Sequence, residues 1–179
     1  MVVGLVSSSA ALLIVPFAEH HAAAVRALFV STNRLMAPPG MGEAFEAYIA
    51  RSLADEIGRI ADYYGDHEGG FWVALRDGVV VGMFGLERVS AEAMELRRMY
   101  VDPAARRGGI ARAMLRHAEA ECRKLGARRL ELSTSEIQPA ALALYREAGY
   151  RLVREAIAEQ ISHKTVGSGI RRYYFEKSV

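Results

Sequence analysis

The sequence predicts a single α/β domain built around a mixed β-sheet. Strand-like apolar runs alternate with helical patterns, in the order strand, two helices, a meander, helix, strand, helix and two strands. The chain has 179 residues, of which 51% are hydrophobic. A chain of this length buries one good core and is too short for two comfortable domains. We therefore expect one domain over residues 11–179, preceded by a loose leader over residues 1–10.

The N-terminal third is predicted to hold one strand and two helices. The strand covers Leu12 to Phe17, and the first helix covers Glu19 to Arg34, where apolar residues recur at helical spacing. A run rich in proline and glycine, residues 36–42, ends that helix. The second helix covers Glu43 to Tyr64, with apolar side chains on one side and an acidic side that we interpret as a solvated face.

A hairpin and a third strand follow as a meander. Two apolar runs, Phe71 to Leu75 and Val79 to Leu86, are separated by Arg76 and the dipeptide Asp77-Gly78, which supplies tight-turn geometry. The third strand is predicted over Ala93 to Val101. The remaining elements are a helix over Gly109 to Leu125 stopped by Gly126, a strand over Arg129 to Thr134, a short helix over Pro139 to Ala148 stopped by Gly149, and strands over Tyr150 to Arg154 and Gly169 to Glu176.

Charge is unevenly distributed, although the formal net charge is only +2. A basic cluster surrounds a glycine pair, and an acidic group lies earlier in the chain. A basic cluster at a glycine pair suits a phosphorylated small molecule better than a long polyanion, so nucleic-acid binding is disfavoured. The basic cluster is Arg97, Arg98, Arg106, Arg107 and Arg112. The acidic group is Glu43, Glu46, Asp55, Glu56, Asp62, Asp66 and Glu68.

The single cysteine and the five histidines offer little chemistry. Cys122 lies within a helical pattern and is expected to be a buried apolar residue. The histidines lack metal-ligand spacing, and the rings of His20 and His21 are expected to point apart, so no metal is predicted. The first residues lack the basic region of a signal peptide and no run has the length of a membrane span, which predicts a cytoplasmic chain.

The most informative segment is the strand-to-helix junction around Gly108 and Gly109. Alone, a glycine pair there is more often a simple turn. Flanked by Arg106 and Arg107 and followed by a helix, its amides can point at one phosphate group. It is neither a Walker loop nor a G-x-G-x-x-G fingerprint, so an ATP enzyme is a remote alternative and NAD is not indicated.

These residues resemble the GNAT superfamily of acyl-CoA-dependent N-acyltransferases. Its hallmark, R/Q-x-x-G-x-G/A after a strand, is filled by Arg106, Gly109 and Ala111. A second signature of the family, N-x-x-A-x-x-L-Y followed by Gly-Phe or Gly-Tyr, is nearly met by Gln138, Ala141, Leu144, Tyr145, Gly149 and Tyr150. The resemblance is strong from about Phe71 to Val153. The run Thr134-Ser135 before the second signature is similar to the camello, or N-acetyltransferase-8-like, branch.

The resemblance implies a GNAT-type sheet, mixed, mostly antiparallel and twisted, flanked by helices, with acetyl-CoA as co-substrate. Residues Arg107, Gly108, Gly109, Ile110, Ala111 and Arg112 would hold the pyrophosphate through their amides, with Arg106 at the start of the motif. The backbone of Met99, Tyr100 and Val101 would pair with the pantetheine arm, and the Met99 amide would polarise the thioester carbonyl.

The resemblance also assigns catalytic roles. An amine would attack the thioester directly, without a covalent enzyme intermediate, and Tyr145 would protonate the departing thiolate. Glu95 is either the general base or a surface carboxylate paired with Arg97. Gln138 stands where the family has Asn, so its longer reach puts its contact with pantetheine in question.

The acceptor is expected to be a small-molecule or peptide amine, bound between residues 36–42 and the C-terminal hairpin. The alternative is a non-catalytic acyl-CoA-binding module. No membrane partner is expected, and a homodimer through the apolar run Ile170 to Phe175 is implied only by analogy. Five aromatic residues are expected to wall the acceptor site: Tyr63, Tyr64, Trp72, Tyr173 and Tyr174.

Overall fold

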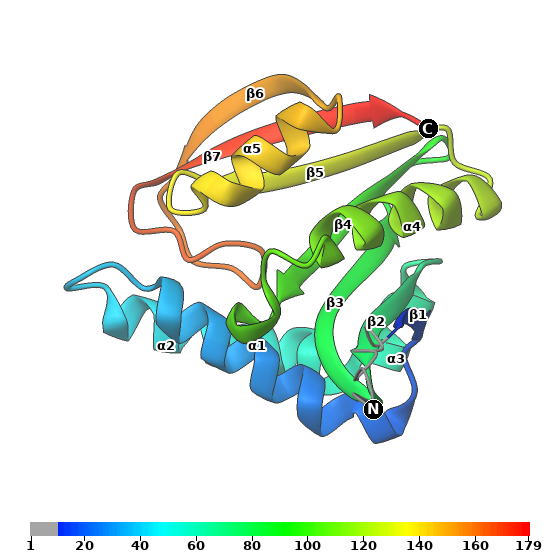
Figure 1. Ribbon diagram of the computed structural model, residues 1–179. Coiled ribbons are helices and arrows are strands. Elements are labelled where there is room, and N and C mark those ends of the chain that lie inside the picture. Colours follow the sequence, from blue (N-terminus) through cyan, green and yellow to red (C-terminus); the bar gives the residue numbers. More distant parts are fainter. Residues whose placement is uncertain (1–10) are drawn as a thin grey trace, which may run out of the picture.

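The computed structural model describes residues 11–179, and the predicted leader lies outside them. The described residues form a seven-stranded sheet in the order β1-β2-β3-β4-β5-β7-β6, in which only the β4–β5 pair is parallel (Figure 1). The strands are β1 Leu12–Pro16, β2 Gly70–Arg76, β3 Val79–Arg88, β4 Ala93–Val101, β5 Arg129–Ser135, β6 Arg151–Ala158 and β7 Ile170–Ser178. The expected mixed, mostly antiparallel sheet is confirmed.

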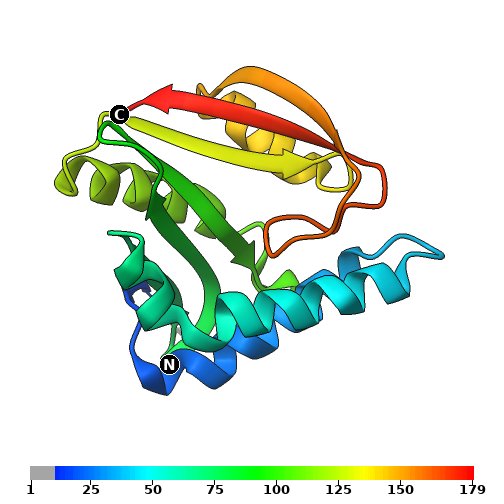
Figure 2. The ribbon, with the colours of Figure 1, turned by 180° about the vertical axis from the view of Figure 1, so that it is seen from behind.

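Helices cover both faces of this sheet (Figures 1 and 2). On one face, α1 and α3 pack against the central strands, and α2 lies along α1. On the other face, α4 packs against β3 and β4, and α5 against β5. The helices are α1 Ala22–Met36, α2 Gly42–Asp55, α3 Ile60–Asp66, α4 Ile110–Lys124 and α5 Pro139–Glu147, with short 3-10 turns at Glu19–His21, Ile57–Arg59 and Pro103–Ala105.

Strand alternation divides the apolar core into two clusters. Along β2, Phe71 and Val73 face α1 and α3 and belong to one cluster, the α1–α3 cluster. Trp72 and Ala74 face α4 and belong to the other, the α4 cluster. Successive side chains of a strand point to opposite faces, so a nearly continuous apolar run serves a sheet covered on both sides. The hairpin prediction is also confirmed, because Asp77 and Gly78 have φ values of 53° and 76°, as a two-residue type I′ turn requires.

The helix expected over Glu43 to Tyr64 is wrong as a single helix. It breaks at Glu56, whose φ and ψ are −141° and −65°, into α2, a 3-10 turn and α3. The break turns the Glu56 carboxylate inward, where it is fully buried. A Cβ at Gly58 would lie 2.5 Å from the Leu53 carbonyl oxygen, so the tight return of the chain needs glycine there.

The two halves of the sheet separate between β4 and β5. Parallel pairing joins Ala93–Leu96 to Arg129–Leu132 and goes no further among the described residues. Arg98 has a φ of 54°, and the β3–β4 register shifts beside it, so β4 bulges at this point. The strands then diverge, and the loop of residues 159–169 between β6 and β7 crosses the side of the gap that faces α2 (Figure 2). This gap positions the candidate site.

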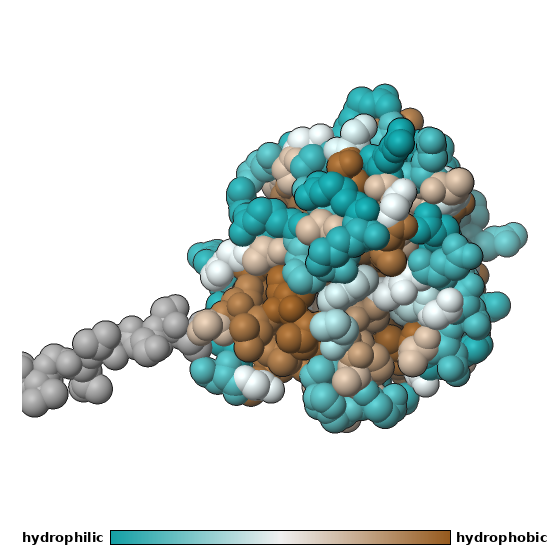
Figure 3. All heavy atoms as spheres, turned by 90° about the vertical axis from the view of Figure 1, so that its right-hand side faces the viewer, coloured by the Kyte–Doolittle hydropathy of each residue, from teal (hydrophilic) through white to brown (hydrophobic). Residues whose placement is uncertain are grey.

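The C-terminal strand does not offer a free edge. In the sheet, β7 pairs with β5 on one side and β6 on the other, so the backbone of Ile170–Phe175 has no free edge to which a second chain could add a strand. The edges are β1 and β6. Leu13 on β1 and Val79 at the hairpin turn are exposed, and Figure 3 shows an apolar area beside the grey N-terminal residues.

Candidate active site

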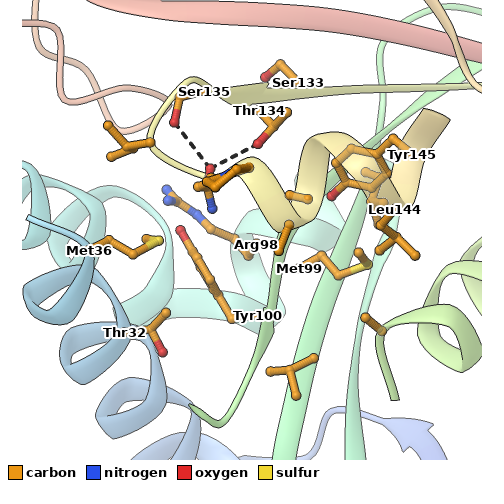
Figure 4. Close-up of a pocket in the computed structure, with 18 of the residues that line it drawn as sticks. Thr32, Met36, Arg98, Met99, Tyr100, Ser133, Thr134, Ser135, Leu144 and Tyr145 are labelled. Atoms are coloured by element: carbon orange, nitrogen blue, oxygen red, sulfur yellow. Dashed lines mark hydrogen bonds between the residues drawn. The ribbon is translucent and has the colours of Figure 1, made fainter. Parts of the chain in front are cut away.

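A cavity of about 830 Å³ occupies the gap between β4 and β5 (Figure 4). It reaches both faces of the sheet, because its walls include the start of α4 and α5 on one face and α1, α2 and the β6–β7 loop on the other. Of the site residues predicted from the sequence, only Gly108 is not in the lining. A Cβ on Gly108 would lie 3.0 Å from the Arg76 guanidinium, so that residue faces away from the cavity. The predicted site residues that do line the cavity are Glu95, Met99, Tyr100, Val101, Arg106, Arg107, Gly109, Ile110, Ala111, Arg112, Gln138 and Tyr145.

The glycine loop presents unpartnered backbone amides to this cavity. Gly109, with a φ of 72°, caps α4, and Arg107 is also left-handed, with a φ of 67°. Within residues 11–179, no acceptor is found for the amides from Arg107 to Arg112, and the first helical bond on this side runs from Ala113 to the Gly109 carbonyl. Free N–H groups at the positive end of a fifteen-residue helix bind an anion such as a phosphate.

The bulge in β4 leaves a second set of backbone groups available. Beyond Leu96, β4 has no partner strand on its β5 side within the described chain, so Met99, Tyr100 and Val101 line the cavity along an unpaired edge. Figure 4 shows Met99 and Tyr100 on this part of β4, below α5. An extended ligand can pair with such an edge as an added strand does.

Tyr145 extends from α5 into the cavity. Its ring is buried against Tyr150 and Phe175, with centroids 5.9 and 6.2 Å away, while its hydroxyl points toward Met99 (Figure 4). Burial, with a smaller effect from the nearby Tyr100, raises the pKa of Tyr145 above its ordinary value. The side chain is therefore a protonated phenol at neutral pH and can donate a proton only to a strong base such as a thiolate.

Glu95 lies on the opposite part of the cavity wall. Its Oε2 atom is 2.8 Å from the Lys164 Nζ atom and 4.0 Å from the Arg97 guanidinium. Burial raises the pKa of the Glu95 carboxyl, although the Lys164 ammonium and Arg97 oppose that effect. The predicted partner Arg97 is thus secondary, and the nearer partner, Lys164, was missed from the sequence.

Gln138 is held by the end of β5. The hydroxyls of Thr134 and Ser135 donate to its Oε1 atom at 3.1 and 3.4 Å. With the oxygen occupied in this way, the Nε2 group remains as a donor in the cavity wall. The amide chemistry of the family's Asn is therefore kept, and a polar ligand can accept from it.

A buried ion network supports the wall that faces α2. Glu56 accepts from Arg97 at 2.6 Å, from Arg98 at 2.7 and 3.0 Å, and from Tyr64 at 2.6 Å. Burial alone raises the pKa of Glu56, but the two guanidiniums outweigh it and hold that pKa at about 2. Two expectations are therefore corrected: Glu56 is not part of a solvated face, and Arg97 and Arg98 do not belong to the basic cluster at the glycine loop.

Glu87 continues this network toward the β6–β7 loop. It accepts from Tyr63 at 2.6 Å and contacts Lys164 Nζ at 2.5 Å and Arg97 at 3.4 Å. Burial raises the pKa of Glu87, but Arg97 and Lys164 lower it to about 2. The His163 carbonyl accepts from Arg98, so two consecutive loop residues fasten the loop to the network.

The aromatic walls expected for the acceptor are wrong. Within the described chain, none of the five predicted aromatic residues lines the cavity: Tyr63 and Tyr64 lie in the α1–α3 cluster, and Trp72 stacks on Phe84 at 5.3 Å. Strand alternation sends the other two elsewhere, since Tyr173 packs against the α4 cluster and Tyr174 lies under the Arg154 guanidinium. The side chains of α1, α2 and β4 that take their place are Met36, Phe45, Tyr48 and Tyr100.

Cysteine and histidine chemistry is absent from the cavity lining. Cys122 is buried in α4, as predicted, and burial raises the pKa of its thiol. His20 and His21 are closer than expected, with ring centroids 4.0 Å apart on a 3-10 turn, so the expectation of diverging rings is wrong.

Across residues 11–179 there is no group of three His, Cys, Asp or Glu side chains placed to hold a metal. No helix in this range has the length and apolar character needed to cross a bilayer.

Comparisons with known proteins agree with the geometry. A family model described as the acetyltransferase (GNAT) family matches residues 38–150. N-acetyltransferase family 8 member 3 of Rattus norvegicus is 34% identical over 117 residues, covering 62% of this chain and 51% of the relative. The IAA acetyltransferase of Azospirillum brasilense is 42% identical over 82 residues, covering 45% and 53%. The chain thus spans about half the length of these curated relatives.

A solved structure shares the fold over nearly the whole chain. The PaiA N-acetyltransferase of Thermoplasma acidophilum, in complex with coenzyme A, superposes with a TM-score of 0.74. The match covers 94% of this chain and 99% of that one, at 16% identity. At that identity the likeness establishes the fold, while the family rests on the model match.

Proposed function

Because the chain belongs to the GNAT family of acyl-CoA-dependent N-acyltransferases, we propose that it transfers the acetyl group of acetyl-CoA directly to a primary amine in the β4–β5 cavity. One observation carries this proposal. A single cavity joins unpartnered amides at the start of α4, the Tyr145 hydroxyl and the Glu95 carboxylate. The acceptor amine belongs to a small molecule or a peptide.

The donor would be held mainly by backbone. The amides from Arg107 to Arg112 would bind the pyrophosphate, and the open edge from Met99 to Val101 would pair with the pantetheine arm. Gln138 would donate a hydrogen bond from Nε2. An acetyl thioester placed along β4 brings its carbonyl near the Met99 amide, which would stabilise the developing oxyanion.

Glu95 would act as the general base. Its raised pKa brings the carboxylate closer to the pKa of an amine acceptor, and it can accept the ammonium proton directly or through water. Tyr145 would then protonate the departing thiolate. The one cysteine does not favour a covalent acyl-enzyme, because it is buried in α4 and its thiol has a raised pKa.

The test is thiol release from acetyl-CoA across amino acids, polyamines, aminoglycosides and peptides. Tyr145→Phe should reduce kcat by about 10²–10⁴-fold, because it removes the general acid. Tyr150→Phe is the matched control: it lies at the same helix end but hydrogen-bonds Glu119 at 3.1 Å outside the cavity, and it should leave kcat near that of the unsubstituted chain. Unchanged turnover in Tyr145→Phe would remove Tyr145 from the acid role.

The base role is tested by pH. The rate constant kcat/KM should rise with pH as Glu95 loses its proton, and Glu95→Gln should flatten this limb. The defect should shrink at high pH, where the acceptor amine is already neutral. A Glu95→Gln defect that is constant with pH would contradict the base role.

Two further expectations have their own tests. A binding module without activity would bind acetyl-CoA tightly by calorimetry and release no thiol with any amine. The homodimer and the cytoplasmic location remain predictions, to be tested by sedimentation velocity and by cell fractionation.

A further inference from the structure

Lys164 places a primary amine inside the cavity proposed for acetyl transfer. It lines that cavity from the β6–β7 loop, and its side chain is 43% exposed. Its Nζ atom lies 2.5 Å from Glu87 Oε1 and 2.8 Å from Glu95 Oε2. An acceptor ammonium that gives its proton to Glu95 needs the same kind of contact with that carboxylate.

The loop that carries Lys164 is fastened where it stands. The neighbouring His163 carbonyl accepts from the buried Arg98 and from Ser52, and Val166 packs against the α1–α3 cluster. The amine is therefore held beside Glu95 by its own chain, and a reacting group held in position gains a large effective concentration.

The two other lysines provide an internal comparison. The chain has three lysines, at positions 124, 164 and 177. Each forms an ion pair: Lys124 with Glu121 at 2.6 Å, and Lys177 with Glu119 at 2.8 Å. Neither of these two lines the cavity, so Lys164 differs from them in location rather than in pairing.

We propose that Lys164 is a self-acetylation site, modified within its own chain by the acetyl-CoA that the cavity binds. This inference rests on the proposed function. The Lys164 ammonium gives one proton to Glu95, which releases it to water. The Nζ–C bond forms as the C–S bond breaks, the thiolate takes a proton from Tyr145, and the second proton of the nitrogen passes through water to restore the Tyr145 hydroxyl. The products are Nζ-acetyl-Lys164, free coenzyme A and one net proton.

Acetylation would also change the acceptor end of the cavity. It converts a cation into a neutral amide, so Glu87 and Glu95 each lose the partner at 2.5 and 2.8 Å. Glu87 keeps Arg97 and Tyr63, whereas Glu95 keeps only the 4.0 Å approach of Arg97. The two carboxylates that lose the Lys164 charge then suit an incoming acceptor ammonium.

The experiment incubates the full chain with acetyl-CoA and no added amine, then maps acetyl groups by peptide mass spectrometry. Lys164 should be labelled more than about tenfold faster than Lys177, which has a similar ion pair outside the cavity. The rate constant should not change with protein concentration, because the reaction is intramolecular. Equal labelling of the three lysines, or a rate constant that grows with protein concentration, would overturn the proposal.

Two variants and a parallel assay separate this proposal from the proposed function. Glu95→Gln should slow the labelling of Lys164 and leave that of Lys177 unchanged, and Lys164→Arg should abolish the major acetylated peptide. The same samples are assayed for thiol release with the amine panel. Turnover of an added amine without Lys164 labelling overturns self-acetylation and leaves the proposed function standing. The absence of both overturns both.

Discussion

The two walls of the cavity are built from opposite materials. The wall at the start of α4 consists of backbone amides, from Arg107 to Arg112, that have no acceptor within the described chain. The wall facing α2 is supported from behind by side-chain charges, in which Glu56 and Glu87 already contact guanidinium or ammonium groups. The first wall is therefore prepared for an anion, whereas the second holds its shape without a ligand. Substitutions in the two walls should consequently have different effects, on ligand binding in one and on stability in the other.

The largest effect is expected in the charged wall. Glu56→Gln leaves the buried Arg98 guanidinium without its carboxylate and Arg97 with only the longer contact to Glu87 at 3.4 Å, and this should lower the free energy of unfolding by about 3–5 kcal/mol. Urea denaturation followed by circular dichroism measures it. The matched control is Glu46→Gln: Glu46 also pairs with an arginine at 2.7 Å, but both side chains are more than half exposed, so the cost should be about 0–1 kcal/mol. Equal losses in both variants would contradict the distinction.

The same wall predicts acid sensitivity. Glu56 and Glu87 have pKa values of about 2 in the folded chain, below the ordinary value of 4.5. A depressed carboxyl pKa stabilises the fold above the unfolded value, and this stability is lost as pH falls from about 4.5 toward about 2. Urea midpoints measured through this range should fall. In Glu56→Gln the fall should be smaller, because only Glu87 still contributes, and an equally steep fall would count against the network.

The amide wall is tested by a pair of glycines at the two ends of α4. Gly109 and Gly126 have φ values of 72° and 80°, and a Cβ at either meets no atom within 4 Å. Alanine at each should therefore cost about 1–2 kcal/mol of stability through backbone strain alone. Only Gly109→Ala disturbs the amides that face the cavity, so it alone should raise the KM for acetyl-CoA, by about tenfold for a loss of about 1.4 kcal/mol. An equal KM change in Gly126→Ala would show that strain, not the lost contact, is responsible.

The smallest effect is expected at Gln138. Its loss removes one neutral hydrogen bond to the donor, worth about 0.5–1.5 kcal/mol, so Gln138→Ala should raise the KM for acetyl-CoA between about two- and twelvefold, with kcat unchanged. Steady-state kinetics measures this. Gln138→Asn should recover part of the loss, because it restores the amide with a shorter reach, and no difference between the two variants would indicate that the Nε2 group contacts nothing.

The sequence predicted the amide wall well and the charged wall poorly. The glycine loop, the strand before it and Tyr145 are local patterns, in which residues close in the chain supply the chemistry. The charged wall joins Glu56, Arg98 and Lys164, which come from three distant segments, and no local spacing brings them together.

One signal in the sequence does point to the buried carboxylate. Counting from Ile49 and Leu53 in steps of three or four, Glu56 falls on the apolar side of its helix before Ile60. A charge on that side indicates burial with a partner, and Gly58 two residues later permits the break. Lys164 carries no such signal, since it lies in a loop whose course is fixed by contacts with α2, α3, β3 and β4, which are distant in the chain.

The difference between the walls is measured most directly by amide hydrogen exchange with and without coenzyme A. We expect peptides covering Arg107 to Arg112 to exchange more slowly when coenzyme A is bound, because their amides gain acceptors. Peptides covering Glu56 should not change, since that wall has its partners already. Unchanged exchange at Arg107 to Arg112 under saturating coenzyme A would contradict the account.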